Sequence, residues 1–295
     1  MTVRRRRAGA GDAGSEGGLD MDIEILEMTE RKASFILKNS TPAMANALRR
    51  TILTDIPKMA IDKVEFHLGP IMVDGKEYES ITPLFDEIIA HRLGMVPVPT
   101  DLKLFVPQRE CSCGGEGCPS CTIMYSLNKI GPCTVLSGDL IPLGDPSLKV
   151  KDEYIPIVEL ADGQAVLIYT IATMGTAKTH VKWQVANGVG YKYAPIVKVD
   201  GDKCKHCGRC FSECPKRVFS GDAKKVKVTN AIGCTLCESC QTFCPSKAIS
   251  FKADDKNFVF RFETDGSLSA ETVLNKAVSL LSEQARSFGQ LAEKF

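Results

Sequence analysis

The sequence predicts an α+β fold with more than one domain, and three observations support this prediction. A hairpin-like pattern followed by a helical one opens the chain after residue 20, short strand-like runs separated by Gly and Pro fill its middle, and two groups of cysteines have metal-ligand spacing. At 295 residues with 44 % hydrophobic side chains, the chain can bury two or three separate cores.

The first patterned segment, residues 21–59, indicates a β-hairpin followed by a helix. Apolar and polar residues alternate on both sides of the expected turn. Thr41 can cap the helix, Pro42 suits its first position, and Pro57 stops it. Its polar face carries three residues that are candidates for an interface, Asn46, Arg49 and Arg50.

Residues 60–195 are predicted to form a mostly β domain, with strands that include 154–160, 164–173 and 181–185. A glycine-rich loop in this domain has no core-forming residues of its own. The loop carries four thiols within 11 residues, Cys111, Cys113, Cys118 and Cys121. Four thiolates can close a tetrahedral site, and zinc is the expected ion. Metal-free reduced cysteines or adventitious disulfides are the alternative.

Residues 196–252 are predicted to form a ferredoxin-like α+β domain that binds two [4Fe-4S] clusters. Eight cysteines repeat one pattern, Cys-x2-Cys-x2-Cys-x3-Cys-Pro, with an offset of 30 residues. In such runs the first three thiolates hold one cluster and the fourth holds the other. The ligands are therefore assigned as Cys204, Cys207, Cys210 and Cys244 for the first cluster, and Cys234, Cys237, Cys240 and Cys214 for the second.

The same stretch contains residues suited to surround such clusters. A strand is expected at 224–229, and five bulky side chains are expected to cover the clusters, namely Phe211, Val218, Phe219, Phe243 and Ile249. His206 lies between two ligands and is expected to be exposed instead of ligating. A zinc ribbon or a disulfide set is the alternative, but zinc rarely uses a cysteine triplet with a trailing Cys-Pro.

The last segment, residues 253–295, is predicted to be a strand at 258–262 and a long helix that begins near Ser269. Apolar residues recur at three- and four-residue steps along the helix, at Val273, Leu274, Ala277, Val278, Leu281, Ala285, Phe288 and Leu291. The stripe is about six turns long. Part of it should pack on the chain's own sheet, and the remainder is expected to dock against a helix of another subunit, with Val278, Leu281 and Phe288 as candidates.

Composition excludes several functions. With 37 Lys and Arg against 36 Asp and Glu, the net charge is +1, so any contact with DNA is expected to be indirect. Thirteen cysteines without an apolar run long enough for a signal peptide or membrane span indicate a reducing compartment, the cytoplasm, and no membrane association. Residues 1–20, with four consecutive arginines and a Gly/Ala/Ser stretch, are expected to be disordered.

Three longer strings carry a family resemblance. They are Thr41–Arg50 with Pro57 behind it, Phe85–Pro97, and His180–Trp183. Together they resemble the D-type subunit of archaeal DNA-directed RNA polymerase, in a family that includes the amino-terminal domain of the bacterial α subunit and the third-largest subunit of eukaryotic RNA polymerase II. Val181 replaces the alanine that many relatives have after the histidine. The resemblance covers the chain from Met21 onward.

The resemblance implies a dimerisation domain split in sequence, built here from 21–59 and 253–295, with the other domains inserted. Subunits of this kind pair with small subunit L, join small subunits N and P, and form the platform for the large catalytic subunits. We find no nucleophile–base pair, phosphate loop or acidic triplet for magnesium in the sequence, so this chain is expected to contribute no catalytic residues to the nucleotidyltransferase.

Three functions follow from these observations. The leading one is a non-catalytic assembly subunit of DNA-directed RNA polymerase, whose clusters stabilise the insert. Such clusters would also allow oxygen or the redox state to affect assembly of the polymerase. The alternative is a ferredoxin-type electron-transfer protein, which would explain only the ferredoxin-like stretch. Direct DNA binding by Arg49, Arg50 or the arginines near the start is the weakest, since arginines in a disordered tail attract any polyanion.

Overall fold

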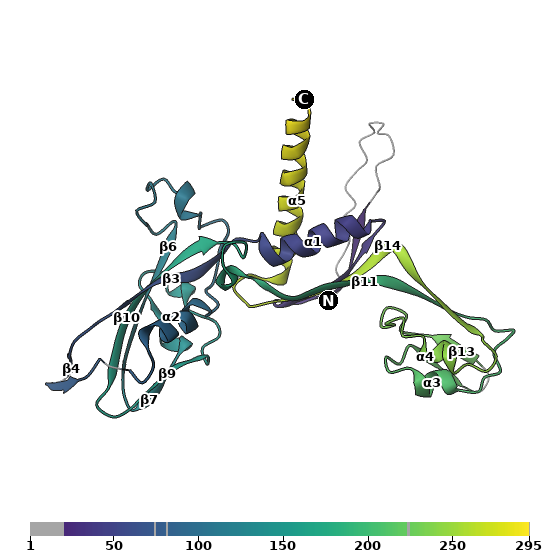
Figure 1. The fold of residues 1–295 in the computed structure, drawn as a ribbon, viewed down its shortest axis with the longest axis horizontal. Coiled ribbons are helices and arrows are strands. Elements are labelled where there is room, and N and C mark those ends of the chain that lie inside the picture. Colours follow the sequence, from purple (N-terminus) through teal and green to yellow (C-terminus); the bar gives the residue numbers. More distant parts are fainter. Residues whose placement is uncertain (1–20, 74, 81, 223–224, 295) are drawn as a thin grey trace.

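The computed structural model describes residues 21–294 except 74, 81, 223 and 224, so the predicted disordered extension 1–20 lies outside the described residues. The fold is α+β, as predicted, with antiparallel sheets and few long helices. Figure 1 shows three parts in a row: a central sheet with two helices, a β-rich part on the left and a cysteine-rich insert on the right.

The central part is a four-stranded antiparallel sheet in the order β1-β2-β14-β11. Its strands are β1 (Asp22–Met28), β2 (Lys32–Lys38), β14 (Ile249–Thr264) and β11 (Ala186–Val199). Apolar residues of β2 and β14 alternate toward one face, where the rings of Phe35 and Phe260 stack with centroids 5.0 Å apart. The predicted strand at 258–262 is the C-terminal part of a longer strand, β14.

Two helices cover this face, α1 (Pro42–Thr54) and α5 (Ala270–Ala292). Both begin where the sequence predicts. The Thr41 hydroxyl accepts a hydrogen bond from the Met44 amide at 3.3 Å, and the Ser269 hydroxyl accepts one from the Thr272 amide at 3.2 Å. Their inner faces complete a core with Phe258, Phe260 and Phe262.

The β-rich part contains a second sheet in the order β3-β10-β6-β8. Its strands are β3 (Lys58–Phe66), β10 (Ala165–Gly175), β6 (Thr122–Ile130) and β8 (Ile141–Pro142), and two ribbons pair β4 (Ile71–Val73) with β5 (Lys76–Tyr78) and β7 (Cys133–Leu136) with β9 (Pro156–Leu160). Helix α2 (Asp86–Gly94) and the single turns η1 (Gln108–Glu110), η2 (Ser137–Asp139), η3 (Pro146–Leu148) and η4 (Val181–Trp183) join them. A separate core fills this part, with Tyr125 fully buried in it.

The strand expected at 181–185 is wrong, because residues 181–183 form the 3₁₀ turn η4. The His180 ring nitrogen Nδ1 accepts a hydrogen bond from the Lys182 amide, which curls the backbone at this point. The indole of Trp183 then turns inward and donates to the carbonyl of Thr173 at 3.0 Å. The buried, hydrogen-bonded indole of Trp183 therefore holds this segment in place of hydrogen bonds between strands.

The cysteine-rich insert is small. It contains helices α3 (Arg209–Glu213) and α4 (Ser239–Thr242) and the hairpin strands β12 (Phe219–Asp222) and β13 (Lys225–Val228), the latter close to the strand expected at 224–229, although Lys224 lies outside the described residues. Val218, Phe219 and Ile249 are buried in its core, as expected for residues that cover the metal sites. The expectation for Phe243 is wrong, since 51 % of this residue is exposed.

The insert is joined to the central sheet by two long strands. β11 and β14 pair from Ala186 and Thr264 in the central sheet to Val199 and Ile249 beside the insert, and Figure 1 shows them running outward together. The predicted domain limits at 195/196 and 252/253 lie inside these strands. The connection is therefore a paired β-ribbon instead of a flexible linker.

Candidate metal centres and partner surface

The four cysteines of the glycine-rich loop lie together. Their sulfur atoms are all within 4.8 Å of one another, with 3.5 Å between Cys111 and Cys118, 3.7 Å between Cys113 and Cys121, and 3.9 Å between Cys118 and Cys121. A tetrahedral zinc site with Zn–S bonds of about 2.3 Å has sulfur–sulfur edges of about 3.8 Å. The spacing therefore matches a site for one four-coordinate ion.

The loop can curl this tightly because three of its glycines adopt left-handed backbone angles. These residues are Gly114, Gly115 and Gly117. The Gln108 side chain donates to the Gly115 carbonyl at 2.6 Å, and the Cys118 amide donates to the Cys121 sulfur at 3.3 Å. Backbone conformation, not packing of large side chains, brings the four thiols together.

The thiols of this loop differ in acidity. Hydrogen bonds from the Gly117 and Gly115 amides lower the pKa of Cys113 to about 6, whereas burial raises the pKa of Cys121 to about 12. A cation bound among the sulfurs would favour the thiolate form of all four cysteines. The donor set and its spacing fit a thiophilic metal ion.

The eight cysteines of the insert surround two hollows. One hollow is lined by Cys204, Cys207, Cys210 and Cys244, and the other by Cys214, Cys234, Cys237 and Cys240. Each hollow therefore takes three cysteines from one copy of the repeat and one from the other.

The backbone repeats with the cysteines. Non-glycine residues with positive φ occur in pairs offset by the same interval as the cysteines, with His206 matching Leu236 and Arg217 matching Lys247. Amide groups also point at sulfur in both halves. The Val218 amide donates to Cys214 and the Ala248 amide to Cys244, each at 3.4 Å. Such N–H···S bonds stabilise a thiolate that ligates metal.

His206 is half-buried, and its Nδ1 lies 3.8 Å from the Cys204 sulfur. The third cysteine of each copy of the repeat holds its thiol proton more tightly than an ordinary cysteine does. Burial raises the pKa of Cys210, and it raises the pKa of Cys240 to about 11, with the neighbouring cysteines adding to the effect. Thiolates gathered in this way repel one another without a cation, so the donor sets fit a metal centre in each hollow.

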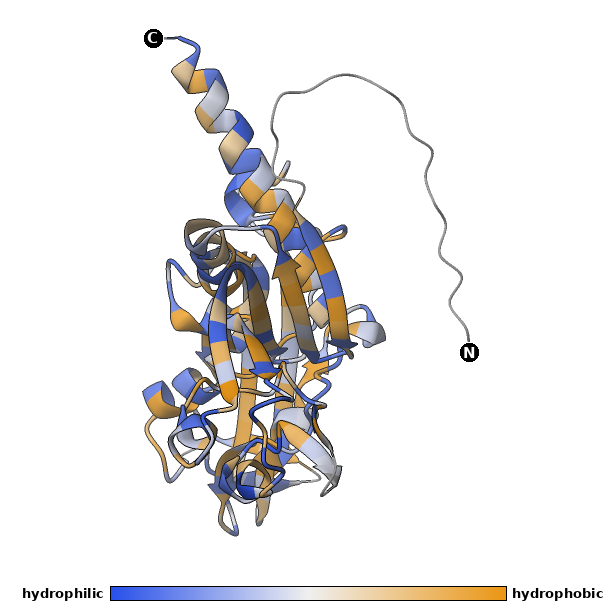
Figure 2. Cartoon of the chain, turned by 90° about the vertical axis from the view of Figure 1, so that its right-hand side faces the viewer, coloured by the Kyte–Doolittle hydropathy of each residue, from blue (hydrophilic) through white to orange (hydrophobic). Residues whose placement is uncertain are grey.

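The apolar stripe of α5 is only partly covered. Val273, Leu274 and Ala277 are buried on the central core, whereas 45 % of Val278, 74 % of Phe288 and 55 % of Leu291 are exposed and Leu281 is half-buried. Figure 2 shows the second half of α5 extending beyond the rest of the described fold. Large apolar side chains on a projecting helix are typical of a partner interface.

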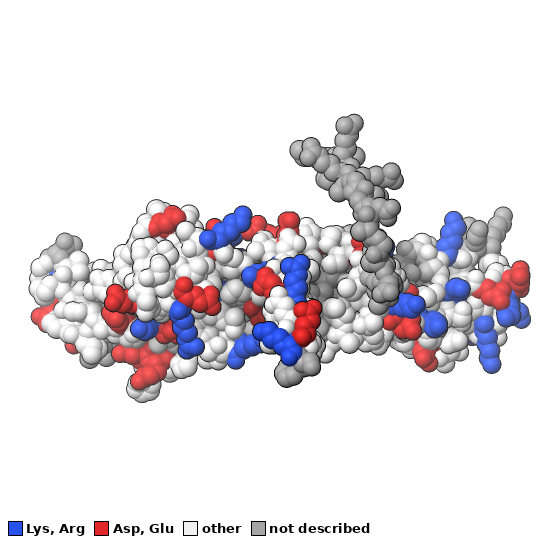
Figure 3. Space-filling view, turned by 90° about the horizontal axis from the view of Figure 1, so that it is seen from above, with Lys and Arg blue, Asp and Glu red and all other residues white. Residues whose placement is uncertain are grey.

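The polar face of α1 lies near this stripe. Asn46 accepts hydrogen bonds from Arg49 at 3.0 and 3.2 Å, so these two side chains hold each other, and Arg50 is exposed. Arg50 and Leu281 line the same shallow hollow between α1 and α5. Figure 3 shows Lys and Arg interspersed with Asp and Glu along the upper face, so charge there is mixed.

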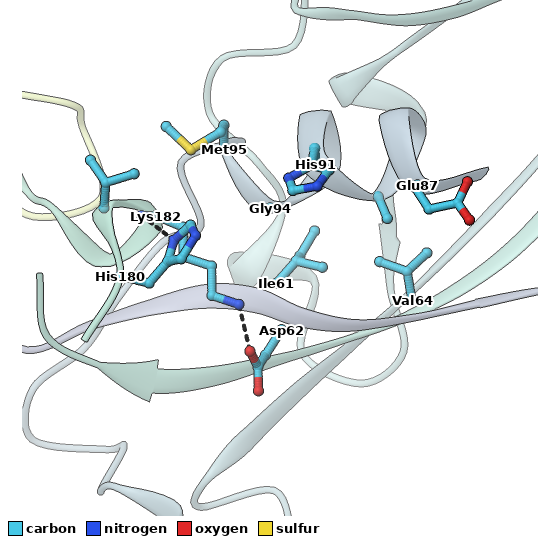
Figure 4. A pocket seen from close by; sticks show the side chains of 11 residues that line it. Ile61, Asp62, Val64, Glu87, His91, Gly94, Met95, His180 and Lys182 are labelled. Carbon is cyan, nitrogen blue, oxygen red and sulfur yellow. Dashed lines mark hydrogen bonds and ion pairs between the residues drawn. The ribbon is translucent and has the colours of Figure 1, made fainter. Parts of the chain in front are cut away.

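A second surface brings together two of the strings quoted above. Helix α2 and the turn η4 line one open hollow, in which His91 and Met95 face His180 and Lys182 (Figure 4). Lys182 forms an ion pair with Asp62 of β3 at 2.5 Å. The sequence does not reveal that the segments 85–97 and 180–183 meet, because no local pattern relates one to the other.

Comparison with known proteins decides the family. The model of the family described as RNA polymerase Rpb3/Rpb11 dimerisation domain matches residues 34–285. The chain belongs to this family. The Rpb3/Rpb11 match begins in β2 and ends in α5, so it includes β2, β11 and β14 of the central sheet and both inserted segments, while β1 lies before it.

Three archaeal proteins show the similarity along nearly the whole chain. The DNA-directed RNA polymerase subunit Rpo3 of Thermoplasma volcanium is 44 % identical over 90 % of this chain and 96 % of that protein. Rpo3 of Picrophilus torridus is 43 % identical over 89 % and 96 %, and Rpo3 of Archaeoglobus fulgidus 39 % over 92 % and 98 %. Among the described residues, no helix is long and apolar enough to cross a membrane.

Proposed function

We propose that this chain is the assembly subunit of an archaeal DNA-directed RNA polymerase. It pairs with small subunit L through its split dimerisation domain, residues 21–59 and 253–295, and the pair forms the platform for the large catalytic subunits and for small subunits N and P. Contact with DNA is indirect, and the protein acts in the cytoplasm. The homology to archaeal Rpo3 along nearly the whole chain supports this role.

The observation that best supports pairing with another subunit is the exposed second half of α5. After Ala277 no residue of α5 is fully buried and only Leu280 and Leu281 still pack partly on the central core, yet the helix keeps its apolar stripe for several further turns. An isolated amphipathic helix in water gains nothing from such a stripe, so a partner helix is the natural cover. Small subunit L is the proposed partner.

The metals proposed are two [4Fe-4S] clusters and one Zn²⁺. All eight insert cysteines are described, yet among the described residues the Cys111 to Cys121 set is the only group of three or more metal-binding side chains with all donor atoms within 4.8 Å. The insert sulfurs are therefore spread wider than a single tetrahedral ion permits. Two hollows with wider spacing and four cysteines each favour clusters over zinc in the insert.

These metals would stabilise the folded parts of the chain that bind them. The insert buries only a handful of apolar residues besides its cysteines, and a domain with so small a core takes its stability from metal binding. When bound, each cluster also supplies an oxidisable centre, so assembly of the polymerase would be sensitive to oxygen or redox state. The chain's own contribution is to gather thiolates and shield them.

The decisive experiment for the proposed function is anaerobic isolation of the tagged chain from its source cells. Mass spectrometry should identify subunit L and the large polymerase subunits, and the complex should synthesise RNA from a DNA template. Recovery of redox enzymes without polymerase subunits would overturn the proposal.

Metal content is tested on the purified protein. We expect about eight iron atoms and one zinc per chain. Cys118→Ser should remove zinc and keep the iron, whereas Cys133→Ser, which changes a cysteine outside all three sets, should keep both metals. Iron in the Cys118 loop, or zinc in the insert, would contradict the assignment.

A ferredoxin-type electron-transfer protein is the second candidate. Cys207 and Cys237 are exposed, so one ligand of each proposed cluster is accessible from solvent. Short tunnelling paths to a partner would follow from this exposure. Rapid, reversible reduction of the isolated protein by a cellular electron donor would favour this candidate.

A further inference from the structure

The pairing of β11 with β14 has two irregularities, one between Asn187 and Gly190 inside the central sheet and one where the ribbon leaves that sheet toward the insert. Tyr193 of β11 pairs with Phe258 of β14, but the next residue, Ala194, pairs with Asp254. Residues 255–257 are therefore left out of the ladder as a bulge. Bulges bend and twist a strand pair locally, so this is the point at which the ribbon can pivot.

The bulge separates two cores. On its inner side, Val189 and Tyr191 of β11 pack against the core of the central sheet. On its outer side, Val197 and Val199 pack against the core of the insert. The outer ribbon and the insert form one body, and the inner ribbon belongs to the central sheet.

The bulge is held from the central side. The Asn257 side chain donates to Asp254 at 2.7 Å and accepts from the Asn39 amide at 3.1 Å. The Lys256 carbonyl accepts from the Ser40 amide at 2.8 Å. These contacts tie the bulge to the junction between β2 and α1.

One side chain bridges the bulge toward the insert. Lys192 pairs in the sheet with Val259, on the inner side. Its half-buried side chain reaches outward, where Nζ donates to the carbonyls of Ile232 at 2.5 Å and Cys234 at 2.7 Å. Cys234 lines the second hollow, so Lys192 links the central sheet directly to a loop beside this hollow.

We propose that Lys192 is a latch that fixes the orientation of the insert relative to the dimerisation sheet, and that the latch closes only when the second cluster orders the loop at 232–234. This inference rests on the proposed iron-sulfur function. The reason is geometric: two backbone carbonyls converge on one ammonium only while the loop between Asn230 and Cys234 keeps its turn, and that turn leads directly into a cluster ligand. Loss of the second cluster would thus free the insert at the bulge without unfolding the central sheet.

The test compares hydrogen exchange in variants of the iron-loaded full chain. Lys192→Met removes both hydrogen bonds and keeps the length of the side chain. Amides of 230–236 and of the bulge at 254–258 should then exchange roughly tenfold faster, and half of the iron should be released faster to a chelator. Lys198→Met, an exposed lysine farther along the same strand, is the matched control and should behave as wild type.

Two further variants separate a latch from simple loss of packing. Lys192→Arg can still donate to both carbonyls and should restore most of the protection. Cys237→Ser, which removes a second-cluster ligand, should free the bulge as Lys192→Met does, and adding Lys192→Met to it should free the bulge no further. Amides of β2 and α1 should exchange at the wild-type rate throughout, which shows that the central part remains folded.

The outcomes are distinguishable. If the wild-type protein contains iron but Lys192→Met behaves like Lys198→Met, the latch is wrong and the proposed clusters stand. If the double variant frees the bulge more than Cys237→Ser alone, Lys192 acts independently of the second cluster and the coupling is wrong. If the wild-type protein binds no iron, the proposed clusters and the latch fail together.

Discussion

Trp183 shows how a single residue replaces a predicted strand. Its indole packs directly over Gly175, where an added Cβ would lie 2.5 Å from ring carbons. The sequence contains one tryptophan, so its fluorescence reports this contact alone. Because Gly175 has no side chain, the large ring of Trp183 fits against it, and this contact explains why residues 181–183 leave the sheet. The periodicity of apolar residues cannot reveal such a contact.

Gly175→Ala should displace the indole and destabilise the β-rich part by about 1–3 kcal/mol, as overpacking does in other cores. Fluorescence of Trp183 during urea unfolding measures the effect. Gly190→Ala is the control, because no atom lies within 4 Å of a Cβ added there. Equal stability of the two variants would contradict the tight packing of Trp183.

Tyr125 provides a pH-dependent test of the second core. It is fully buried and donates to the Leu148 carbonyl at 2.8 Å, and burial raises the pKa of its phenol above the ordinary value of about 10. Because the folded state holds the proton more tightly than the unfolded state, this stabilisation is complete below pH 10 and declines above it. The decline should approach about 1.4 kcal/mol per pH unit.

We therefore expect the difference in unfolding free energy between wild type and Tyr125→Phe to shrink as the pH rises from 8 to 11. Urea unfolding at each pH, followed by Trp183 fluorescence, measures that difference. Alkaline conditions suit this comparison, since they keep the metal-binding cysteines deprotonated. Tyr154→Phe, at a phenol that is largely exposed, controls for loss of one tyrosine. A difference that is constant with pH would contradict the burial of the Tyr125 proton.

At the scale of elements, α5 divides into two halves with different roles. The cap at Ser269 and the apolar periodicity were readable in the sequence because both are local. Which turns of the helix pack internally was not readable, because that depends on where the central sheet ends. Ala277 is the last fully buried residue, Leu280 and Leu281 pack partly on the core, and the helix is exposed from Ser282 onward.

Substitutions in the two halves should separate folding from pairing. Leu274→Ala, in the buried half, should destabilise the protein by about 2–5 kcal/mol. Phe288→Ala should change stability by less than about 0.5 kcal/mol, but weaken binding to subunit L by about 2 kcal/mol, roughly 30-fold. Calorimetric titration with subunit L measures the binding. Ser282→Ala, exposed on the same helix, should bind normally; unchanged binding by Phe288→Ala would argue against α5 as the interface.

At the scale of the whole molecule, the arrangement is modular but connected. Three cores lie in separate parts of the chain, and the buried ion pair of Lys58 with Asp265 and the bidentate pair of Arg31 with Asp152 tie the β-rich part to the central one. The insert is tied instead by the ribbon. The structural change caused by loss of the insert's metals should therefore stay within the insert and its ribbon.

Cys207→Ser tests this modularity. It should lower the iron content and disorder the insert, while pairing with subunit L survives. Iron analysis, hydrogen exchange and size-exclusion chromatography with subunit L measure the three effects. Loss of pairing in a protein whose central sheet remains folded would show that the insert contributes to the dimer interface.

Local patterns along the chain were enough to predict the α+β class, the helix starts at Thr41 and Ser269, and the candidate metal-binding cysteines, because caps, turns and ligand spacing are properties of a few neighbouring residues. Tertiary structure alone decided that residues 181–183 form a turn, that α2 and η4 share one hollow, that β11 and β14 continue into the insert, and that Lys192 reaches the loop at Cys234. Each of these depends on contacts between segments far apart in the chain, whose energies arise only after the sheets have formed.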